Sequence, residues 1–297
     1  MPKGFEVSLP RDHGSSGTRS PRLRVAACQT SPILGDVHAN LASVVATAET
    51  LAGSSDLIVL PECALTGYML TADEAQGVAQ EIPGPITSHL INLSRNLDVV
   101  LVVGMIERQA DALHNVAVVC DRDGGLYVYR KSHLPRMGVD KVCVPGSDGF
   151  IPIGTTLGKL GIQICYDFRF PEPSRLLTLR GAELLILIAA WPDTATDYPD
   201  FINRCRAAEN RLPVVAAASA GRERGTEYLG HSQIVGPDGA VLAEAGPEAA
   251  VLKESLAALG LAPAAPVRGR PEGDAGLLGD RRPELYGGLV DSMDART

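Results

Sequence analysis

Three reactive side chains follow predicted strands in this 297-residue chain, each just after a strand's C-terminal end. Glu62 follows LIVLP, Lys131 follows LYVYR and Cys165 follows LGIQI. Open α/β sheets bind ligands beyond the carboxyl ends of their strands, so this placement favours a functional site. A thiol, a carboxylate and an ammonium group that meet there would suit nucleophilic attack on a carbonyl carbon.

Cys165 lies in GIQICYDFRFPE, where a predicted strand turns into a predicted helix. Such an elbow exposes a nucleophile and aims a backbone N–H group at the substrate. The alternative for a free cysteine is a small buried hydrophobic residue. We give that interpretation to the other five, which are Cys28, Cys63, Cys120, Cys143 and Cys205.

A nucleophilic cysteine needs a base, and none of the six histidines has a local feature that selects it. Glu62 is the alternative, because partial burial of a carboxyl raises its proton affinity and makes it a better base. An ordinary carboxylate at a helix N-terminus is the competing interpretation. Lys131 is a candidate for stabilising an oxyanion with a fixed positive charge, or else a solvated surface lysine.

Alternating strands and helices predict a single α/β domain with a central mixed sheet. The apolar patterns place strands at 23–29, 56–60, 99–106, 114–120, 126–129, 160–164, 184–189, 214–218, 232–235 and 240–243. Helices are expected at 40–51, 88–97, 173–180 and 200–211, and Asp-Gly-Gly at 123–125 predicts a hairpin. Residues 131–149 form a predicted long loop.

The two ends of the chain differ from this middle part. Residues 1–20 lack an apolar stretch, so we expect a disordered leader and not a signal peptide. Residues 259–297 are rich in Pro, Gly, Ala and Arg, so we expect a tail that docks in part through Arg282–Tyr286. The domain between them is predicted to span 21–258.

Composition excludes several function classes. With 35 acidic and 27 basic residues, the chain has no basic excess for binding nucleic acid. Six scattered cysteines without a CxxC pair argue against a disulfide framework and against a structural zinc site. The sequence contains no run of about 18 apolar residues, which a membrane-spanning helix would need. These features favour a cytoplasmic protein that acts on a small molecule.

Several motifs, in this order along the chain, resemble the nitrilase superfamily of carbon–nitrogen hydrolases. They are VLPE at 59–62, ALHNVAVV at 112–119, YRKSHL at 129–134, GIQICYDFRFPE at 161–172, RCRAAENRLPVVAAASAG at 204–221 and GHSQIVGPDG at 230–239. Any one motif would be weak, but the ordered set is specific and covers about residues 23–254.

The resemblance implies an αββα sandwich, in which two sheets pack face to face and helices cover the outside. It implies a homodimer or a higher homo-oligomer, in which the helix after Cys165 and the RCRAAEN helix meet across a twofold axis. Arg206, Glu209 and Asn210 on that helix are therefore expected to hold the fold or the dimer. No metal or organic cofactor is implied.

The resemblance also implies a mechanism. Glu62 would take the thiol proton, the Cys165 thiolate would attack an amide carbonyl, and Lys131 with the Tyr166 N–H would hold the oxyanion. Ammonia or an amine would leave, and water activated by Glu62 would hydrolyse the thioester. The expected substrate is a small linear amide or N-carbamoyl compound. The alternatives are a nitrilase acting on a C≡N group and a non-catalytic binding or scaffold relative.

One position departs from the family pattern. Many relatives carry a second Glu after the lysine, about seven residues before the Gly of a Pro-Gly pair. Here that position is Val139, counted from Gly146, and the neighbouring acid is Asp140. We therefore expect Asp140 to serve as the second carboxylate beside Lys131.

Arg169, His133 and Trp191 are candidate substrate-binding residues. Arg169 lies four residues after Cys165, where some relatives bind a substrate carboxylate, and a guanidinium fork suits that group. The competing interpretation of Arg169 is an ion pair with Glu172 or Asp167 that fixes the elbow.

Overall fold

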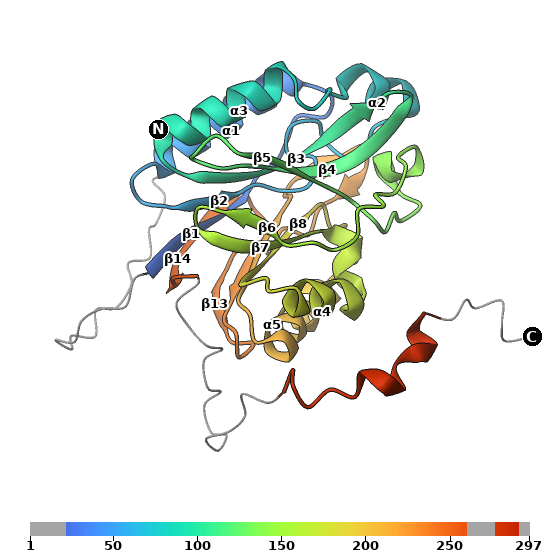
Figure 1. The fold of residues 1–297 in the computed structure, drawn as a ribbon. Coiled ribbons are helices and arrows are strands. Elements are labelled where there is room, and N and C mark those ends of the chain that lie inside the picture. Colours follow the sequence, from blue (N-terminus) through green and yellow to red (C-terminus); the bar gives the residue numbers. More distant parts are fainter. Residues whose placement is uncertain (1–21, 260–276, 291–297) are drawn as a thin grey trace, which may run out of the picture.

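The computed structural model describes residues 22–259 and 277–290. Two six-stranded sheets pack face to face, and helices cover the outer face of each (Figure 1). This is the αββα sandwich that the resemblance implies, and it corrects the expectation of one central mixed sheet, because the strands divide between two sheets. The predicted leader, residues 1–20, lies outside the described residues.

The first sheet has the order β14-β1-β2-β3-β4-β5. β1, β2 and β3 run parallel, and the other neighbours are antiparallel. The hairpin predicted at 123–125 joins the last two strands. The strands in sequence order are β1 (Arg22–Gln29), β2 (Leu57–Val59), β3 (Val100–Gln109), β4 (Ala112–Cys120), β5 (Leu126–Arg130) and β14 (Ala250–Ala257).

The second sheet has the order β13-β12-β9-β8-β7-β6. β7, β8 and β9 are its parallel centre. Its strands are β6 (Ile153–Thr155), β7 (Gly158–Ile164), β8 (Leu184–Ala189), β9 (Val214–Ala218), β12 (Gln233–Val235) and β13 (Val241–Glu244). A separate two-stranded ribbon joins β10 (Arg222–Glu223) and β11 (Thr226–Glu227).

Alternate side chains of the first sheet face opposite layers. In β2, Leu57 and Val59 pack into the core between the sheets, whereas Ile58 packs under the outer helices. Both faces are buried, which explains why the parallel strands read as continuous apolar runs. The helices are α1 (Val37–Leu51), α2 (Ala72–Val78), α3 (Pro85–Leu97), α4 (Pro171–Leu179) and α5 (Asn203–Asn210).

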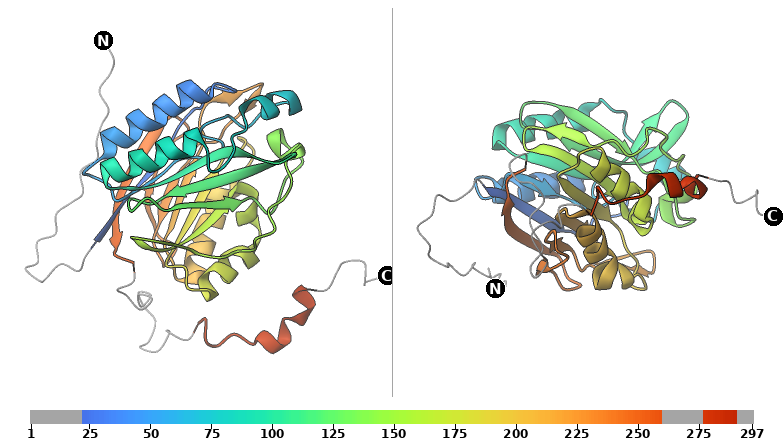
Figure 2. Two further views of the ribbon diagram at one scale, coloured as in Figure 1. Left: turned by 45° about the horizontal axis from the view of Figure 1, so that its top comes forward. Right: turned by 60° about the horizontal axis from the view of Figure 1, so that its bottom comes forward.

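Figure 2 shows α1 and α3 side by side on one sheet and α4 with α5 beyond the other. α4 follows the short 3-10 helix η2 (Cys165–Arg169), and α5 continues from the π-helical turn η3 (Tyr198–Ile202). The sequence predicted one helix over 200–211, so the structure corrects its start. No described helix is long and apolar enough to cross a bilayer.

The sequence analysis assigned no element to α2, β6 or β14. β14 pairs with the whole of β1, from Arg22 opposite Ala257 to Gln29 opposite Ala250. Its letters, AVLKESLA, mix charged and apolar residues because the strand lies at a sheet edge and only Leu256 is fully buried.

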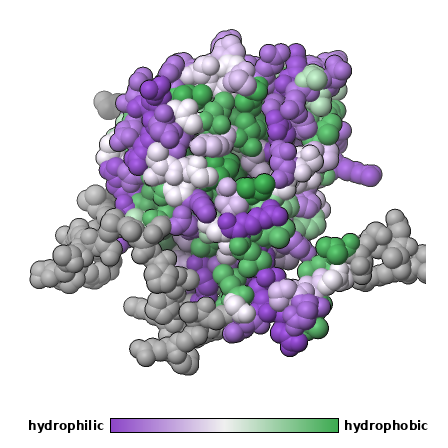
Figure 3. Space-filling view, viewed as in Figure 1, coloured by the Kyte–Doolittle hydropathy of each residue, from purple (hydrophilic) through white to green (hydrophobic). Residues whose placement is uncertain are grey.

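The described part of the tail, residues 277–290, lies beside α4 and α5 (Figure 2). It contains two short 3-10 turns, Pro283–Leu285 and Gly287–Leu289. Apolar side chains stay open here (Figure 3), with Leu289 68% and Val290 88% exposed. Partial docking of the tail therefore stays a prediction.

Candidate active site

The structure brings Glu62, Lys131 and Asp140 into one buried cluster. Lys131 Nζ lies 2.7 Å from Glu62 Oε1 and 2.5 Å from Asp140 Oδ2. All three side chains have no solvent-exposed surface. Asp140 thus makes the lysine contact expected of a second carboxylate, one residue beyond the family position.

Asn115 links the two carboxylates. Its side-chain nitrogen donates to Glu62 Oε1 at 2.7 Å and to Asp140 Oδ1 at 2.9 Å. The oxygen of the same amide lies 3.8 Å from Cys63 Sγ, within range of a thiol hydrogen bond. An amide with both N–H groups engaged holds two like charges at a fixed separation. The sequence analysis missed Asn115, although a polar residue inside the apolar strand ALHNVAVV was a signal.

Both sheets fix the position of Glu62. Its Oε2 accepts the backbone N–H of Ala190, just after β8 in the second sheet, at 2.9 Å. On the first sheet, a Cβ added to Gly104 of β3 would lie 2.3 Å from the Pro61 oxygen and 2.7 Å from Glu62 Cα. Only glycine permits that approach, and a glycine inside a strand was the signal in the sequence.

A short 3-10 turn, η1 (Gly138–Lys141), carries Asp140 inward from the predicted long loop. The Tyr68 hydroxyl donates to Asp140 Oδ2 at 2.9 Å, and Lys131 Nζ lies 5.6 Å from the centre of the Tyr68 ring. Gly138, with φ +49°, packs its backbone against the same ring. No pattern in the sequence selected Tyr68.

Cys165 begins η2 directly after β7, as the elbow motif predicts. Its φ of +45° is rare for a residue other than glycine, and such backbone strain is concentrated at functional sites. The residue keeps 8% of its surface exposed, whereas Glu62 keeps 0% and Lys131 1%. Cys165 is therefore buried but keeps a small exposed surface that the side chains of Glu62 and Lys131 lack.

Asp167 holds the elbow in shape. Its buried carboxylate accepts four hydrogen bonds, from the N–H of Ile164 at 3.1 Å, the Tyr129 hydroxyl at 2.7 Å, and the His133 N–H and ring Nδ1 at 2.9 and 2.8 Å. From α5, the Arg206 guanidinium donates to the carbonyls of Phe168 and Arg169. Arg206 thus serves the fold, as expected.

Burial and neighbouring charges set the protonation of the site. Burial raises the pKa of Glu62, Lys131 opposes that rise, and Asp140 adds to it. Burial also raises the pKa of the Cys165 thiol, and Glu62 raises it further. Burial disfavours the charge on Lys131, but Glu62 and Asp140 outweigh this effect and raise its pKa. The resting site therefore holds a neutral thiol beside a charged lysine and a basic carboxylate.

The candidate substrate-binding residues differ in exposure and in contacts. His133 is partly exposed and stacks on Phe170, with ring centres 4.2 Å apart. Trp191 is fully buried against Tyr198 at 4.9 Å, and its indole N–H has no hydrogen-bond partner among the described residues.

Arg169 corrects an expectation. It pairs with Asp197, and neither of the expected partners, Glu172 and Asp167, takes part in that ion pair. Asp167 is fully used inside the elbow, and the Arg169 side chain points across to the segment before η3, with its guanidinium 5.7 Å from the Tyr198 ring centre. The ion pair therefore joins two segments and does not fix the elbow from within.

The model of the carbon–nitrogen hydrolase family matches residues 24–258. The chain belongs to this family. Its relatives include human omega-amidase NIT2, which is 33% identical over 79% of this chain and 88% of the relative, and a nitrilase of Pyrococcus abyssi, 37% identical over 64% and 72%.

Solved structures of the carbon–nitrogen hydrolase family also match. A carbon–nitrogen hydrolase from Helicobacter pylori superposes with a TM-score of 0.80 at 25% identity, covering 91% of this chain and 99% of that one. An amidase from Nesterenkonia sp. gives 0.79 at 26% identity, covering 93% and 100%. The chain is therefore a carbon–nitrogen hydrolase with amidase and nitrilase relatives. This membership agrees with the expectation that the protein is an enzyme.

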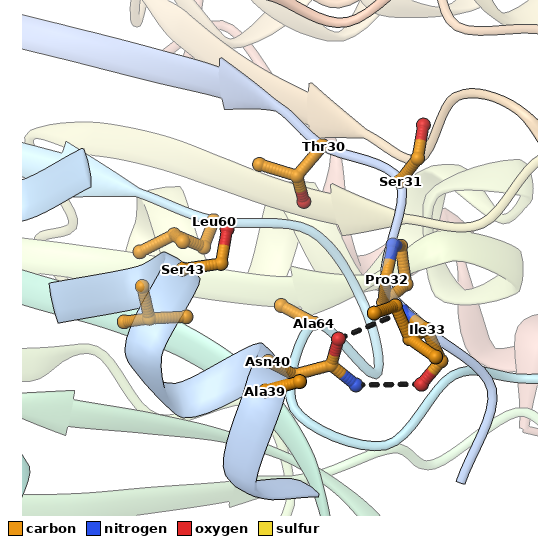
Figure 4. Close-up of a pocket in the computed structure, with 10 residues that line it drawn as sticks. Thr30, Ser31, Pro32, Ile33, Ala39, Asn40, Ser43, Leu60 and Ala64 are labelled. Carbon is orange, nitrogen blue, oxygen red and sulfur yellow. Dashed lines mark hydrogen bonds between the residues drawn. The ribbon is translucent and has the colours of Figure 1, made fainter. Parts of the chain in front are cut away.

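A small cavity of about 110 Å³ lies elsewhere, between the end of β1 and α1 (Figure 4). Its most polar side chain, Asn40, is engaged by the backbone of Ile33 and Leu65. No titratable group lines it, so we assign it no chemistry. Within the described residues, no group of three His, Cys, Asp or Glu side chains is arranged to hold a metal ion.

Proposed function

We propose that this carbon–nitrogen hydrolase is an amidase that cleaves a small linear amide or N-carbamoyl compound through a thioester on Cys165. The observation that carries the proposal is that Cys165, a buried residue with 8% of its surface exposed, lies within electrostatic reach of a fully buried Glu62–Lys131–Asp140 cluster. Burying three charges is costly, and such an arrangement is typical of a site that uses them.

In the first step Glu62 takes the Cys165 proton as the sulfur attacks the amide carbonyl. A thiol with a raised pKa stays protonated at rest, so the base must act during the attack. The raised pKa of Glu62 strengthens it as a base, and the contact with Lys131 keeps it ionised beforehand.

Lys131 and the Tyr166 N–H would hold the resulting oxyanion. Tyr166 lies in the first turn of η2, where N–H groups find no acceptor within the helix. One oxyanion donor contributes about 2.7–4 kcal/mol to transition-state stability. Collapse of the intermediate passes the proton from Glu62 to the leaving nitrogen, and ammonia or an amine departs.

Deacylation repeats the same chemistry with water. Glu62 takes a proton from water, the hydroxide attacks the thioester, and Cys165 leaves with the proton returned by Glu62. We propose that Asn115 and Asp140 keep Glu62 and Lys131 in place through both steps. A buried N–H group without a hydrogen-bond partner costs about 1–3 kcal/mol. The Trp191 indole N–H is such a group among the described residues, so we propose that it donates a hydrogen bond to the substrate. His133, which is partly exposed, is the second candidate for substrate binding.

The relatives support this proposal and one alternative. A mutant of the amidase from Nesterenkonia sp. AN1, which matches at 26% identity and a TM-score of 0.78, carries the product of Michael addition of acrylamide at its active-site cysteine. The names of the Pyrococcus abyssi relative and of a Schizosaccharomyces pombe relative favour action on a C≡N group as the second candidate.

We also propose a cytoplasmic homodimer whose hydrolase domain spans 21–258. Three exposed apolar side chains support pairing through these helices: Leu176 and Leu179 on α4, 38% and 44% exposed, and Phe201 in η3, which leads into α5, 55% exposed. Light scattering after size exclusion should give twice the chain mass of 31.2 kDa.

Intact mass spectrometry with a panel of linear amides, N-carbamoyl compounds and nitriles tests the function. We expect an acyl adduct on Cys165 during turnover of an amide and none in Cys165→Ala. Cys205→Ser is the matched control, because Cys205 is exposed on α5 and should not affect the adduct. Turnover of nitriles alone would select the second candidate, and an adduct on another cysteine would refute the assignment.

A further inference from the structure

Arg169 is a half-exposed cation in the same short helix as Cys165. It ends η2, which begins at Cys165, and four residues of 3-10 helix span about 8 Å. Its guanidinium lies 5.7 Å from the Tyr198 ring centre. Burial raises the pKa of the Tyr198 phenol, the Cys165 group raises it further and Arg169 lowers it, so Tyr198 is within electrostatic reach of both.

This cation already has a carboxylate. Asp197 pairs with Arg169 Nη1, and the Asp197 side chain is 27% exposed while that of Arg169 is 47% exposed. The surrounding segment, PDTATDYPD at 192–200, carries three acidic residues and no Lys or Arg. A substrate carboxylate that approached Arg169 would displace Asp197 and remain beside its negative charge.

We propose that Asp197 is a specificity-determining residue, which occupies Arg169 and directs the enzyme toward amides whose far end carries no carboxylate. The inference rests on the proposed amidase function and names its substrate class. It replaces the expectation that Arg169 reads a substrate carboxylate. Arg169 and Asp197 instead act as an internal ion pair that a neutral or cationic substrate leaves intact.

Two matched substrates test the proposal. Butyramide ends in a methyl group where succinamate ends in a carboxylate. We expect the wild type to have the higher kcat/KM for butyramide. Asp197→Asn should raise kcat/KM for succinamate about fivefold, the factor set by the upper range for an exposed ion pair, and change butyramide less than about twofold. Adding Arg169→Met to Asp197→Asn should remove the gain.

Asp200→Asn is the control for net charge. Asp200 is exposed in η3, and its carboxylate has no hydrogen bond or ion pair within the described part of the chain. The control should leave the ratio of the two substrates unchanged. A wild type that prefers succinamate, or an Asp197→Asn variant with an unchanged ratio, overturns the proposal.

Alkylation of Cys165 separates this inference from the function itself. Iodoacetamide and iodoacetate carry a neutral and an anionic end to the same thiol without any hydrolysis. Asp197→Asn should raise the ratio of the iodoacetate rate to the iodoacetamide rate about fivefold over wild type, by the same ion-pair estimate. If no amide is cleaved but this ratio rises, the amidase proposal fails, whereas the discrimination by Asp197 against an anionic end is supported. An unchanged ratio contradicts that discrimination.

Discussion

Cys63 and Cys165 share many local features, yet we propose only Cys165 as the nucleophile. Each follows a parallel strand, β2 in the first sheet and β7 in the second, and each has positive φ, +52° and +45°. Burial raises the pKa of both thiols, and Glu62 raises both further.

The two thiols differ in access and in partners. Cys63 is 0% exposed and lies against the side-chain oxygen of Asn115, behind the charged cluster. Lys131 lowers the pKa of both thiols in part, but only Cys165, which is 8% exposed, also has its pKa lowered by the Ala190 N–H. A strained cysteine at a strand end therefore does not by itself identify a nucleophile; a small exposed surface and the Ala190 N–H are what distinguish Cys165, the nucleophile that we propose.

The sharpest test of this comparison replaces each thiol. Cys165→Ala should lower kcat by at least about 10⁴-fold, because loss of a nucleophile removes the covalent route. Circular dichroism and thermal melting should stay close to wild type. Loss of activity on stoichiometric iodoacetamide labelling of another cysteine, with Cys165 unmodified, would contradict the assignment.

Asn115→Asp should have the next largest effect. The change replaces two N–H donors with a third carboxylate beside Glu62 and Asp140, which were 2.7 and 2.9 Å from the amide nitrogen. Neighbouring carboxylates raise one another's pKa, so the new carboxylate should leave Glu62 protonated more often and unable to act as a base. We therefore expect kcat to fall about 100-fold or more near neutral pH.

The control for Asn115→Asp is its own pH profile. Below the pKa of the introduced carboxyl group, its protonated form can again donate a hydrogen bond, so the deficit relative to wild type should narrow as pH falls. A deficit that stays constant with pH would assign Asn115 a packing role only.

Much of this architecture was readable from the sequence, and the physical reason is burial. The parallel strands are apolar on both faces, so Leu184–Ala189 was assigned with the bounds that the structure gives. Strand ends located Glu62, Lys131 and Cys165, because a polar residue after an apolar run marks the end of the strand. The resemblance to the family then ordered these residues into one site.

The parts that the sequence left open depend on contacts between distant segments. The Ala190 N–H reaches Glu62 across 128 residues, and Asp197 reaches Arg169 from another loop. No local pattern encodes such contacts. Asp140 was predicted from a one-residue offset, but the bonds from Asn115 and Tyr68 that fix it became visible only in three dimensions.

Asp140→Asn should have a smaller effect, concentrated on Lys131 and Glu62. We expect kcat to fall about 10- to 100-fold, which corresponds to about 1.4–2.8 kcal/mol of transition-state stabilisation. Asp140 raises the pKa of Glu62, so its neutralisation should lower that pKa and move the acid limb of kcat/KM toward lower pH. Rate measurements across the acid range check both effects.

Val139→Ala gives the matched comparison for Asp140→Asn. Val139 is fully buried beside Asp140, and its side chain is apolar, so truncation of this side chain should lower the melting temperature and leave kcat within about twofold. If Asp140→Asn keeps full kcat and an unmoved acid limb, Glu62 and Lys131 act without the second carboxylate.

The smallest effect is expected at Cys63. Its thiol is behind the cluster and donates to an amide whose other contacts remain in place, so Cys63→Ala should lower kcat less than about threefold, or about 0.6 kcal/mol. Cys28→Ala is the control, because Cys28 is equally buried, burial alone raises its pKa to about 12, and it lies in the core under the outer helices. Both variants should lose a similar free energy of unfolding, about 1 kcal/mol per buried group.

The contradicting outcome is a loss of kcat of about 100-fold in Cys63→Ala but not in Cys28→Ala. The buried Cys63 thiol would then orient Asn115 and, through it, both carboxylates. Solvent exposure would no longer distinguish the role of Cys63 from that of Cys165.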